Sequence, residues 1–403
     1  MNLDSVCELI VDAEHKTAPR VESGGYPSIR TPNIGKGRLK MDGVYRVSDE
    51  TYKKWTRRAI PQENDLILAR EAPVGNVAIV PKGIKPCLGQ RTVLLRPNSE
   101  LINPNFLCYY LLSDEIQNKM TSRSGGATVA HLNMKDIREL ELDFVPSLPI
   151  QKKIADILGA YDDLIENNFK RIKLLEETAQ NIYKEWFVNF RFPNHENTPI
   201  DDESGLPEGW GKECLDNLCI KISSGGTPNR KTKEYWDDAK YDWVTTKELK
   251  DCFVFKSAEA ISEIGLEKSS AKLFPIGTVV MAIYASPTLG RLGILTKESC
   301  FNQAAVGFDC NNQKISNHFL YYTLHEERGN LNALAIGAAQ QNINVKKVKD
   351  HKVTIPTVDI VEEFTKVVES NFKLRKSLGI QNIRLKEARD ILLPRLMNRT
   401  IEV

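Results

Sequence analysis

The chain has 403 residues, 41% of them hydrophobic and 27% charged, which is the composition of a globular protein with room for two domains and connecting elements. The formal net charge is only +2, so a uniformly basic surface for nucleic acid is excluded, and DNA binding would depend on local basic patches or on partner chains. No apolar run approaches the roughly 20 residues that cross a bilayer, so we expect no membrane partner.

The N-terminal stretch and the cysteines together predict a cytoplasmic protein. The short apolar run at the start is interrupted by Glu8, Asp12 and Glu14, so it does not resemble a secretory signal. None of the eight cysteines forms a CxxC pair, and Cys214 with Cys219 lacks the second pair that a zinc site needs. We therefore expect reduced, mostly buried thiols and no metal.

The sequence contains an internal duplication with a nearly constant offset. Residues 65–70 align with residues 278–283, and Gln90 aligns with Gln303, both at an offset of 213. Over about eighty residues the offset falls by only three, a register that chance similarity seldom keeps. The sequence therefore predicts two copies of one structural unit.

Each copy has the same predicted order of elements. Short β-rich runs punctuated by glycine and proline come first, followed by a short apolar helix near 104–118 in the first copy and near 317–327 in the second. A glycine-containing loop and a last strand ending in proline follow. A long helix then closes each copy.

The two long helices are expected to bury their apolar stripes against each other as an antiparallel coiled coil. In the first, apolar residues recur in steps of four and three from Ile154 to Trp186, with Asn168 as one polar member. The second stripe is rougher, and Pro394 should end that helix because proline lacks a backbone donor. The alternative is that each helix packs on its own globular unit. The expected pairing residues are Ile154, Leu158, Tyr161, Ile165, Ile172, Leu175, Phe364, Val367, Leu374, Leu378, Leu385 and Leu392.

These patterns divide the chain into five predicted segments. A polar stretch with two prolines and an acidic run follows the first long helix and is predicted to be a surface linker. The expected order is a first globular domain at 1–147, a long helix at 148–191, the linker at 192–209, a second domain at 210–356 and a C-terminal long helix at 357–398.

Several strings in this order resemble the specificity subunits of type I restriction-modification systems. Residues 205–210, Gly-Leu-Pro-Glu-Gly-Trp, resemble the opening of the second target-recognition domain of that family. Residues 223–228, together with 243–246 and 269–275, resemble a common variety of that domain, and residues 15–19 with 25–27 resemble another. The ends of the long helices, at 183–187 and 388–396, are also similar, so the resemblance covers essentially the whole chain.

The resemblance implies an α+β fold with two duplicated α/β target-recognition domains separated by two long antiparallel helices. Each domain would read one half of an interrupted DNA target, and the helices would fix the spacing and dock the modification subunits. The implied partners are double-stranded DNA, two modification (methyltransferase) subunits and two restriction (endonuclease and translocase) subunits. Those partners would use S-adenosylmethionine, ATP and Mg²⁺, whereas this chain would bind no cofactor and catalyse no reaction.

Basic and amide side chains in the glycine-rich loops are the candidate DNA contacts. Clustered lysines and arginines suit phosphates, and arginine, asparagine or glutamine can pair with a purine edge through two hydrogen bonds. The alternative for each cluster is a solvated surface, and for the amides a structural role in a loop. The candidates are Arg30, Lys36, Arg38, Arg57, Arg58, Gln90, Arg91, Arg123, His131, Asn229, Arg230, Lys231, Lys233, Arg291, Gln340, Gln341, Asn342, Lys346 and Lys347.

Two other functions are weighed against this one. A stand-alone DNA adenine methyltransferase would need two consecutive prolines in its catalytic tetrapeptide, but residues 103–106 read Asn-Pro-Asn-Phe. A helix that begins at Pro104 with Asn103 as its N-cap explains that string better. No phosphate-binding GxxxxGK[ST] loop is present, and the six histidines show no metal-ligand spacing. The remaining alternative is a coiled-coil scaffold that does not bind DNA.

Overall fold

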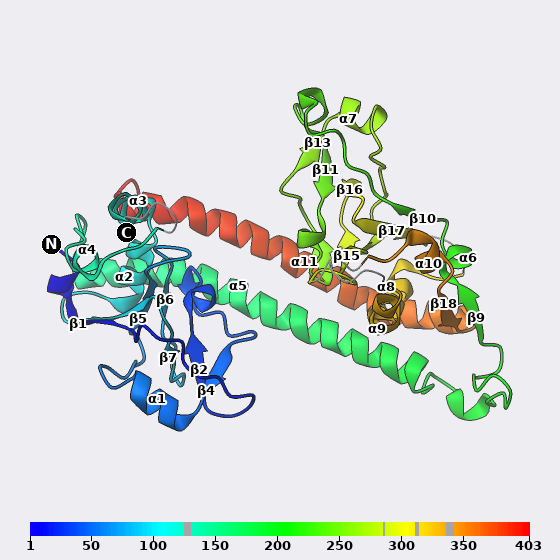
Figure 1. The fold of residues 1–403 in the computed structure, drawn as a ribbon, viewed down its shortest axis with the longest axis horizontal. Coiled ribbons are helices and arrows are strands. Elements are labelled where there is room, and N and C mark those ends of the chain that lie inside the picture. Colours follow the sequence, from blue (N-terminus) through cyan, green and yellow to red (C-terminus); the bar gives the residue numbers. More distant parts are fainter. Residues whose placement is uncertain (125–129, 285–286, 311–313, 336–341) are drawn as a thin grey trace. The chain divides into compact units, whose positions relative to one another are not determined.

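The computed structural model describes residues 1–124, 130–284, 287–310, 314–335 and 342–403 (Figure 1). The chain forms two compact units: unit 1 comprises Met1–Glu166 and Ile383–Val403, and unit 2 comprises Asn167–Asn382. Both long helices contribute to both units, and unit 1 is therefore built from two separate stretches of sequence. None of the described helices is both long enough and apolar enough to cross a membrane.

Unit 1 contains two sheets. The five-stranded sheet is antiparallel except for the pair β3–β6, and the three-stranded sheet combines one antiparallel and one parallel pair. In spatial order the strands are β1 (Cys7–Asp12), β8 (Thr92–Pro97), β5 (Leu66–Ala69), β6 (Val77–Ile79) and β3 (Gly37–Arg38), then β4 (Tyr45–Val47), β2 (Tyr26–Ile29) and β7 (Cys87–Leu88). The short helices are α1 (Asp49–Trp55), α2 (Pro104–Leu111), α3 (Asp114–Arg123) and α4 (Met134–Arg138).

Unit 2 repeats this arrangement and adds a two-stranded sheet. In the same spatial order its strands are β10 (Lys221–Ser224), β17 (Ala305–Asp309), β14 (Val279–Ala282), β15 (Leu292–Leu295) and β12 (Cys252–Val254), then β13 (Ala260–Ile261), β11 (Tyr241–Val244) and β16 (Ser299–Phe301), with β18 (Lys352–Ile355) paired to β9 (Gly211–Cys214). The short helices are α6 (Leu215–Leu218), α7 (Glu263–Glu267), α8 (Asn317–Glu326), α9 (Arg328–Ala333) and α10 (Val345–Lys349).

The topology confirms the predicted duplication. The order β1-β8-β5-β6-β3 in unit 1 corresponds strand by strand to β10-β17-β14-β15-β12 in unit 2, and β4-β2-β7 corresponds to β13-β11-β16. The parallel pairs also correspond, since β3–β6 matches β12–β15 and β2–β7 matches β11–β16. Two mixed α/β units of one fold therefore account for most of the chain, as the sequence repeat predicted.

The helix that follows the last strand of each large sheet begins with the predicted cap. Asn103 Oδ1 accepts a hydrogen bond from the Phe106 amide at 3.0 Å, and Pro104 occupies the first turn of α2. At the corresponding place in unit 2, Ser316 Oγ accepts from the Phe319 amide at 3.1 Å. Both contacts satisfy an amide that has no partner within its helix. The Asn-Pro-Asn-Phe string is thus a helix start.

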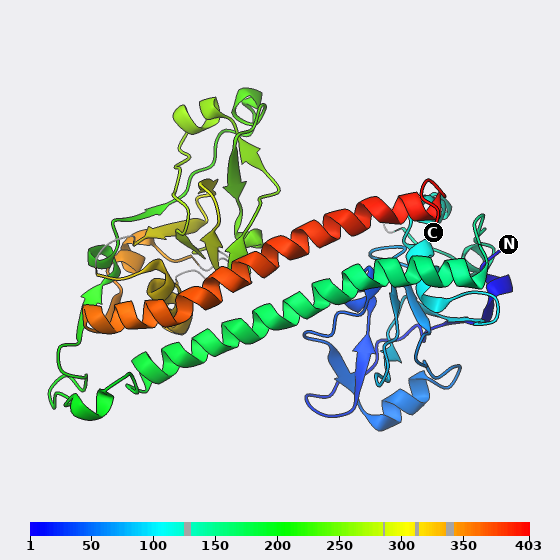
Figure 2. The ribbon, with the colours of Figure 1, turned by 180° about the vertical axis from the view of Figure 1, so that it is seen from behind.

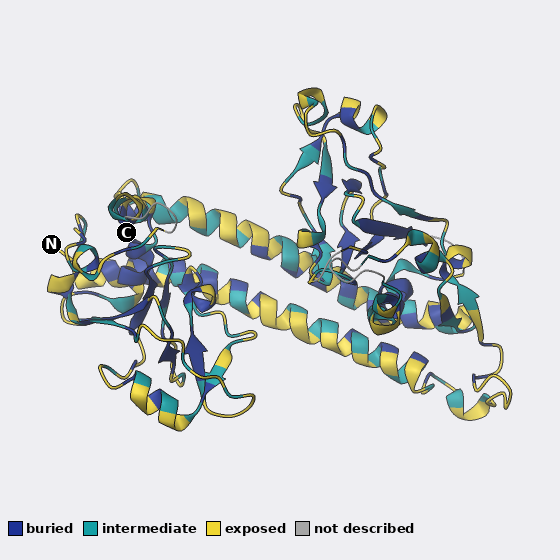
Figure 3. Cartoon of the chain, viewed as in Figure 1, coloured by how far each residue is buried: buried dark blue, intermediate teal, exposed yellow. Residues whose placement is uncertain are grey.

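In each unit the large sheet and the first helix after it form the centre of the core. Leu66 and Leu68 on β5 are fully buried with Phe106 and Tyr110 on α2, and the corresponding strand and helix of unit 2 bury Val279, Met281 and Phe319. In Figures 1 and 3 the three-stranded sheet and its helix, α1 or α7, lie at the end of each unit opposite to α2 or α8. The small sheets are therefore free to carry surface loops.

Two long helices run through the units (Figure 2): α5 (Leu148–Tyr183), extended by the π-helical turn Lys184–Val188, and α11 (Val358–Met397). Within unit 2, Asn371 Nδ2 donates to Leu175 O at 2.9 Å, and Asn168 Nδ2 donates to Asn382 Oδ1 at 3.0 Å. Residue numbers rise along one helix as they fall along the other, so the helices lie antiparallel there.

The buried stripe of α11 differs from the predicted one. Val367 and Leu374 are 44% and 38% exposed, so their prediction as pairing residues is wrong. The side chains that follow steps of three and four along the buried face are Val361, Phe364, Val368, Asn371, Arg375, Leu378, Asn382, Leu385, Arg389, Leu392 and Leu396. The sequence prediction took Leu374 where the buried residue is Arg375, and Val367 where it is Val368. It also left out Asn371, Asn382 and Arg389, because it accepted only apolar members.

The start of α5 packs on its own globular part, as the alternative prediction had it, whereas the end of α11 packs on the first globular part and not on its own. In unit 1, Ile154 and Leu158 of α5 share one core with Phe106, and Leu396 and Met397 of α11 enter the same core. This burial also explains why the expected end of α11 at Pro394 is wrong. Proline removes one hydrogen bond near the helix end, but the helix continues to Met397, and the Asn398 amide donates to Pro394 O at 2.9 Å.

One pair of cysteines departs from the expectation of reduced thiols. Cys219 and Cys310 are joined by a disulfide. The antiparallel pairing of Lys221 with Asp309 in β10 and β17 brings the two cysteines opposite each other at the end of the sheet. Spacing along the sequence gives no sign of this pair, because 91 residues separate the two positions. The other six cysteines are free.

Candidate nucleic-acid interface

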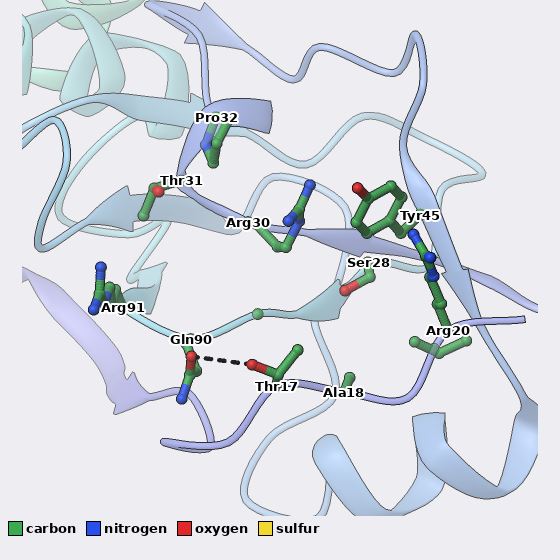
Figure 4. Close-up of a pocket in the computed structure, with 12 residues that line it drawn as sticks. Thr17, Ala18, Arg20, Ser28, Arg30, Thr31, Pro32, Tyr45, Gln90 and Arg91 are labelled. Carbon is green, nitrogen blue, oxygen red and sulfur yellow. Dashed lines mark hydrogen bonds between the residues drawn. The ribbon is translucent and has the colours of Figure 1, made fainter. Parts of the chain in front are cut away.

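A pocket of about 590 Å³ opens on unit 1 beside the three-stranded sheet (Figure 4). Its walls come from the segment after β1, from β2 and the turn that follows it, from Tyr45 on β4, and from the turn between β7 and β8. The lining residues are Thr17, Ala18, Arg20, Ser28, Arg30, Thr31, Pro32, Tyr45, Val47, Gly89, Gln90 and Arg91.

The turn between β7 and β8 presents Gln90 and Arg91 because it lies tightly against β2. The Gly89 amide donates to Ile29 O at 2.7 Å, and a Cβ at Gly89 would lie 2.8 Å from Arg30 Cγ. Only glycine allows so close an approach. Arg91 follows with a φ of 66°, in the left-handed region of the backbone. The glycine thus sets the position of both candidate side chains.

Gln90 is held at two points of its amide. Thr17 Oγ1 donates to Gln90 Oε1 at 3.3 Å, and Gln90 Nε2 donates to the carbonyl oxygen of His15. A backbone carbonyl can only accept a hydrogen bond, so this contact fixes which end of the amide carries the donors. One N–H and one oxygen lone pair of Gln90 are not used by these contacts.

Two arginines share the pocket with an aromatic ring. The guanidinium carbon of Arg30 lies 4.0 Å from the centre of the Tyr45 ring, and that of Arg20 lies 5.2 Å from it. Among the described residues, no carboxylate forms an ion pair with either arginine, and Arg30 Nε is buried without a hydrogen-bond partner. The pocket therefore presents positive charge and one buried donor without a partner, which a negatively charged or acceptor-rich ligand would match.

Unit 2 has equivalent side chains at the equivalent place. Thr227 Oγ1 donates to Gln303 Oε1, as Thr17 does to Gln90, and Arg230 occupies the position of Arg20, three residues after the threonine. The guanidinium carbon of Arg230 lies 3.9 Å from the centre of the Trp236 ring and 4.7 Å from that of Trp243.

The surroundings of the two arginines differ. Arg230 forms two hydrogen bonds of 2.8 and 2.7 Å with Glu259, which occupies the strand position of Tyr45. These bonds and the positive charge lower the pKa of Glu259 and raise that of Arg230. In unit 2 a carboxylate thus neutralises the arginine that is unpaired in unit 1.

Comparisons with known proteins agree with this duplicated arrangement. A family model described as the type I restriction modification DNA specificity domain matches residues 1–177 and, separately, residues 207–378. The chain belongs to this family. It is therefore a non-catalytic subunit that provides DNA sequence specificity, and the stand-alone methyltransferase and the non-DNA scaffold are not favoured.

Curated relatives and a solved structure support the assignment. The chain is 27% identical over 362 residues to the MjaIX specificity subunit of Methanocaldococcus jannaschii, covering 88% of this chain and 81% of that protein. It is 26% identical over 372 residues to the HindI specificity subunit of Haemophilus influenzae, covering 77% and 80%. The fold is similar to that of the S subunit from M. genitalium, with a TM-score of 0.61 at 15% identity over 98% of this chain and 95% of that one.

For a specificity subunit, the remaining candidates in unit 1 divide into paired and unpaired side chains. Arg38 pairs with Asp163 and Glu166 on α5, and Arg57 and Arg58 both face Glu14, at 3.0 and 3.9 Å. Arg123 donates to Glu139 O at 2.9 Å. Lys36 is exposed. These arginines already have partners within the unit, which leaves the exposed Lys36 better placed for a phosphate.

His131 lies within a buried network of charges. Arg70, with a side chain only 7% exposed, contacts Asp12 at 2.6 Å and His131 Nε2 at 2.8 Å. Because arginine has no acceptor, Nε2 must accept this bond, and Nδ1 donates to Glu71 at 2.6 Å. Glu71 also pairs with Arg91 at 2.8 Å, and Arg91 remains 55% exposed. His131 thus positions the loop, whereas Arg91 reaches the surface.

In unit 2 the exposed candidates are Asn229, Arg230 and three lysines. Lys231, Lys233 and Lys346 are exposed, and Lys347 Nζ donates to Leu334 O at 3.2 Å. The Asn229 side chain accepts a hydrogen bond from the Lys231 amide, Arg291 is half-buried, and Asn342 forms a β-bridge with Tyr284. Gln340 and Gln341 lie outside the described residues.

The sequence prediction missed several side chains of the two sites. They are Thr17, Arg20 and Tyr45 in unit 1 and Thr227, Trp236, Glu259 and Gln303 in unit 2. The internal repeat does not give this signal, because at its offset of 213 Thr17 aligns with Arg230, whereas the fold pairs Thr17 with Thr227 at an offset of 210. Tyr45 and Glu259 share no residue type, so only the strand register reveals that they correspond.

Proposed function

We propose that each unit reads one half of a bipartite, interrupted target on double-stranded DNA. The observation that carries this proposal is one fold present twice, with the same threonine–glutamine contact in each unit and different side chains beside it. Duplicated DNA-binding units commonly read spaced half-sites. Tyr45 in one unit and Glu259 in the other make the two surfaces chemically different, so the two half-sites should differ in sequence.

The helix pair would fix the separation of the two half-sites. The stripe of α11 contains Asn371, Arg375, Asn382 and Arg389 among apolar residues. Polar side chains within such a seam specify one register at a cost in stability, because each must meet its own partner. A single register gives a defined spacing. The proposed division into 1–147, 148–191, 192–209, 210–356 and 357–398 assigns the helices at 148–191 and 357–398 to this role.

The helices would also dock two modification subunits. Leu174 on α5 is 62% exposed and Ile391 on α11 is 53% exposed, so each helix offers an exposed apolar side chain as a candidate contact. The modification subunits would use S-adenosylmethionine to methylate an adenine flipped out of each half-site, since a stacked base is out of reach. Two restriction subunits would use ATP and Mg²⁺, and the whole complex would work in the cytoplasm.

Methylome sequencing tests this proposal. A host without other adenine methyltransferases would express this chain together with its modification chain. We expect methylated adenines in one interrupted, asymmetric motif, and none when this chain is omitted. The purified chain alone should transfer no label from S-adenosylmethionine to DNA. A contiguous motif, or methylation without this chain, would overturn the proposal.

A further inference from the structure

The same threonine–glutamine contact is built twice, from equivalent elements. Thr17 and Thr227 each follow the first strand of a large sheet, while Gln90 and Gln303 each lie in the short turn before the last strand. The two partners of a pair are 73 residues apart in unit 1 and 76 in unit 2. The residues around the threonines differ between the units, so the contact persists where the local sequence does not.

The backbone in both units is arranged to bring these partners together. In unit 1, Gly89 lies against Ile29 and Arg30 and sets the position of Gln90. In unit 2, a Cβ at Gly225 would lie 2.0 Å from Phe301 O and 2.6 Å from Asn302 O, so the threonine segment lies directly on the glutamine turn. Two different glycine contacts thus produce the same side-chain arrangement.

This arrangement is not needed for the core. Gln303 is exposed and Gln90 half-buried, and both contacts with threonine lie at the surface. Fixing a long side chain in water costs rotamer entropy and gains little stability from a solvated hydrogen bond. In unit 1 the glutamine also faces a pocket in which Arg30 Nε is buried without a partner. Both observations point to an external partner for the held amide.

The unused atoms of the amide define the chemistry of that partner. After its contacts with Thr17 and His15, Gln90 has one N–H and one oxygen lone pair left. On the major-groove edge, adenine presents an acceptor, N7, beside a donor, the N6 amino group, whereas guanine presents two acceptors. An amide with one donor and one acceptor therefore matches adenine and mismatches guanine.

We propose that Gln90 and Gln303 are equivalent specificity-determining residues, each reading one adenine at the same step of its half-site. Thr17 and Thr227 are positioning residues that fix the amide before DNA arrives. The inference rests on the proposed function and adds to it the base class and the residue in each half. It also requires that the two otherwise different half-sites share one adenine.

Variants of the two glutamines in the complete methyltransferase complex test the inference. Glu at either position has no N–H for N7, so Gln90→Glu should relax or change one adenine of one half-site in the methylome and leave the other half intact. Gln303→Glu should do the same in the other half-site. Thr17→Val should weaken the same position as Gln90→Glu, while Thr17→Ser should behave as wild type.

A DNA-binding measurement tests the adenine contacts of the two glutamines even where a variant complex has no methylation activity. The wild-type complex is titrated with target duplexes in which 7-deazaadenine replaces each adenine in turn, which removes the N7 acceptor. One substitution in each half should weaken binding roughly 5- to 100-fold, and the Gln90→Ala or Gln303→Ala complex should be insensitive to that substitution alone. If neither alanine variant loses a sensitivity that the wild type has, or if the affected base is not adenine, the inference fails. A bipartite wild-type motif would still support the proposed function.

Discussion

Arg375 on α11 forms an ion pair with Glu176 on α5, and both side chains are withdrawn from water, at 2% and 16% exposure. Arg375 also donates to the hydroxyl of Tyr322 at 3.1 Å, which connects the helix pair to α8. Burial lowers the pKa of Arg375 to about 10, a sign of how little solvent reaches the guanidinium. The charge is therefore tolerable only with its partner in place.

Removing Glu176 should destabilise unit 2 strongly. Glu176→Ala leaves a buried, unpaired guanidinium, and breaking such a pair costs about 3–5 kcal/mol. The double variant Glu176→Leu/Arg375→Met removes both charges and should recover most of that loss. Glu369→Ala, which breaks an exposed pair with Lys373 on the same helix, serves as the control and should change little. Urea unfolding of the three variants measures the effect, and equal stability of Glu176→Ala and wild type would contradict the buried pair.

Acid should weaken unit 2 through His318. Its ring packs on Phe372 at 4.2 Å, and burial lowers its pKa, with Glu369 opposing and Lys373 adding to the shift. The folded state thus prefers the neutral ring, and as the pH falls through the unfolded value of about 6.5 the unfolded chain binds the proton first. The stability that the neutral His318 ring contributes above pH 6.5 is therefore lost as the pH falls toward the lower pKa of His318 in the folded state.

The comparison of two variants isolates this contribution. The unfolding free energy of the wild type should fall between pH 7.5 and pH 5.5, and it should fall less for His318→Phe, which keeps an aromatic contact with Phe372. His325 on the same helix also has a pKa lowered by burial, so His318→Phe/His325→Phe should show the flattest profile. Parallel profiles for all three proteins would show that neither ring is kept neutral by the fold.

Lys231 and Arg230 should affect DNA binding in different ways. Lys231 is exposed, so a phosphate contact is its expected role, whereas Arg230 is held by Glu259 and two tryptophans. Lys231→Ala should weaken binding of the complex to all sequences alike and reduce the slope of log K against log salt by about 0.9. Glu259→Gln should free Arg230 and make the slope steeper. Fluorescence anisotropy at four or five salt concentrations measures both, and an unchanged slope for Lys231→Ala would remove it from the interface.

The duplicated fold could be predicted from sequence because the repeat keeps its register through the buried strands. Leu66 and Val279 belong to aligned segments, and both are fully buried in corresponding strands. The N-cap at Asn103 could also be predicted from the sequence, since it depends on only four consecutive residues. The buried stripe of α11 could not be predicted in the same way. A search for a pattern selects apolar residues, whereas Arg375 and Asn382 are buried because they have partners on another helix.

In the candidate sites, too, nearby sequence identified candidate residues but did not reveal partners that lie far away along the chain. Gln90 could be chosen from its glycine-rich surroundings, but its partner Thr17 lies 73 residues away, and only the fold reveals the contact. Arg38 and His131 were chosen for their side-chain chemistry. Their carboxylate partners, Asp163 and Glu71, are brought to them by tertiary structure and give them structural roles. Residue type identifies candidates for DNA contact, and tertiary partners decide which of them remain available.

The spacing of the half-sites should respond to helix length. The pairs Asn168–Asn382 and Leu175–Asn371 hold the seam in register within unit 2. Seven residues inserted in both helices between these pairs keep the order of seam positions and lengthen the pair by about 10.5 Å. DNA rises about 3.4 Å per base pair, so the non-specific spacer of the methylated motif should grow by one to about three base pairs, less where the helices incline to the DNA. The same insertion in α5 alone shifts Asn168 out of line with Asn382 and should abolish methylation, while a double-insertion complex that keeps the original spacer would refute a role of the helices in setting it.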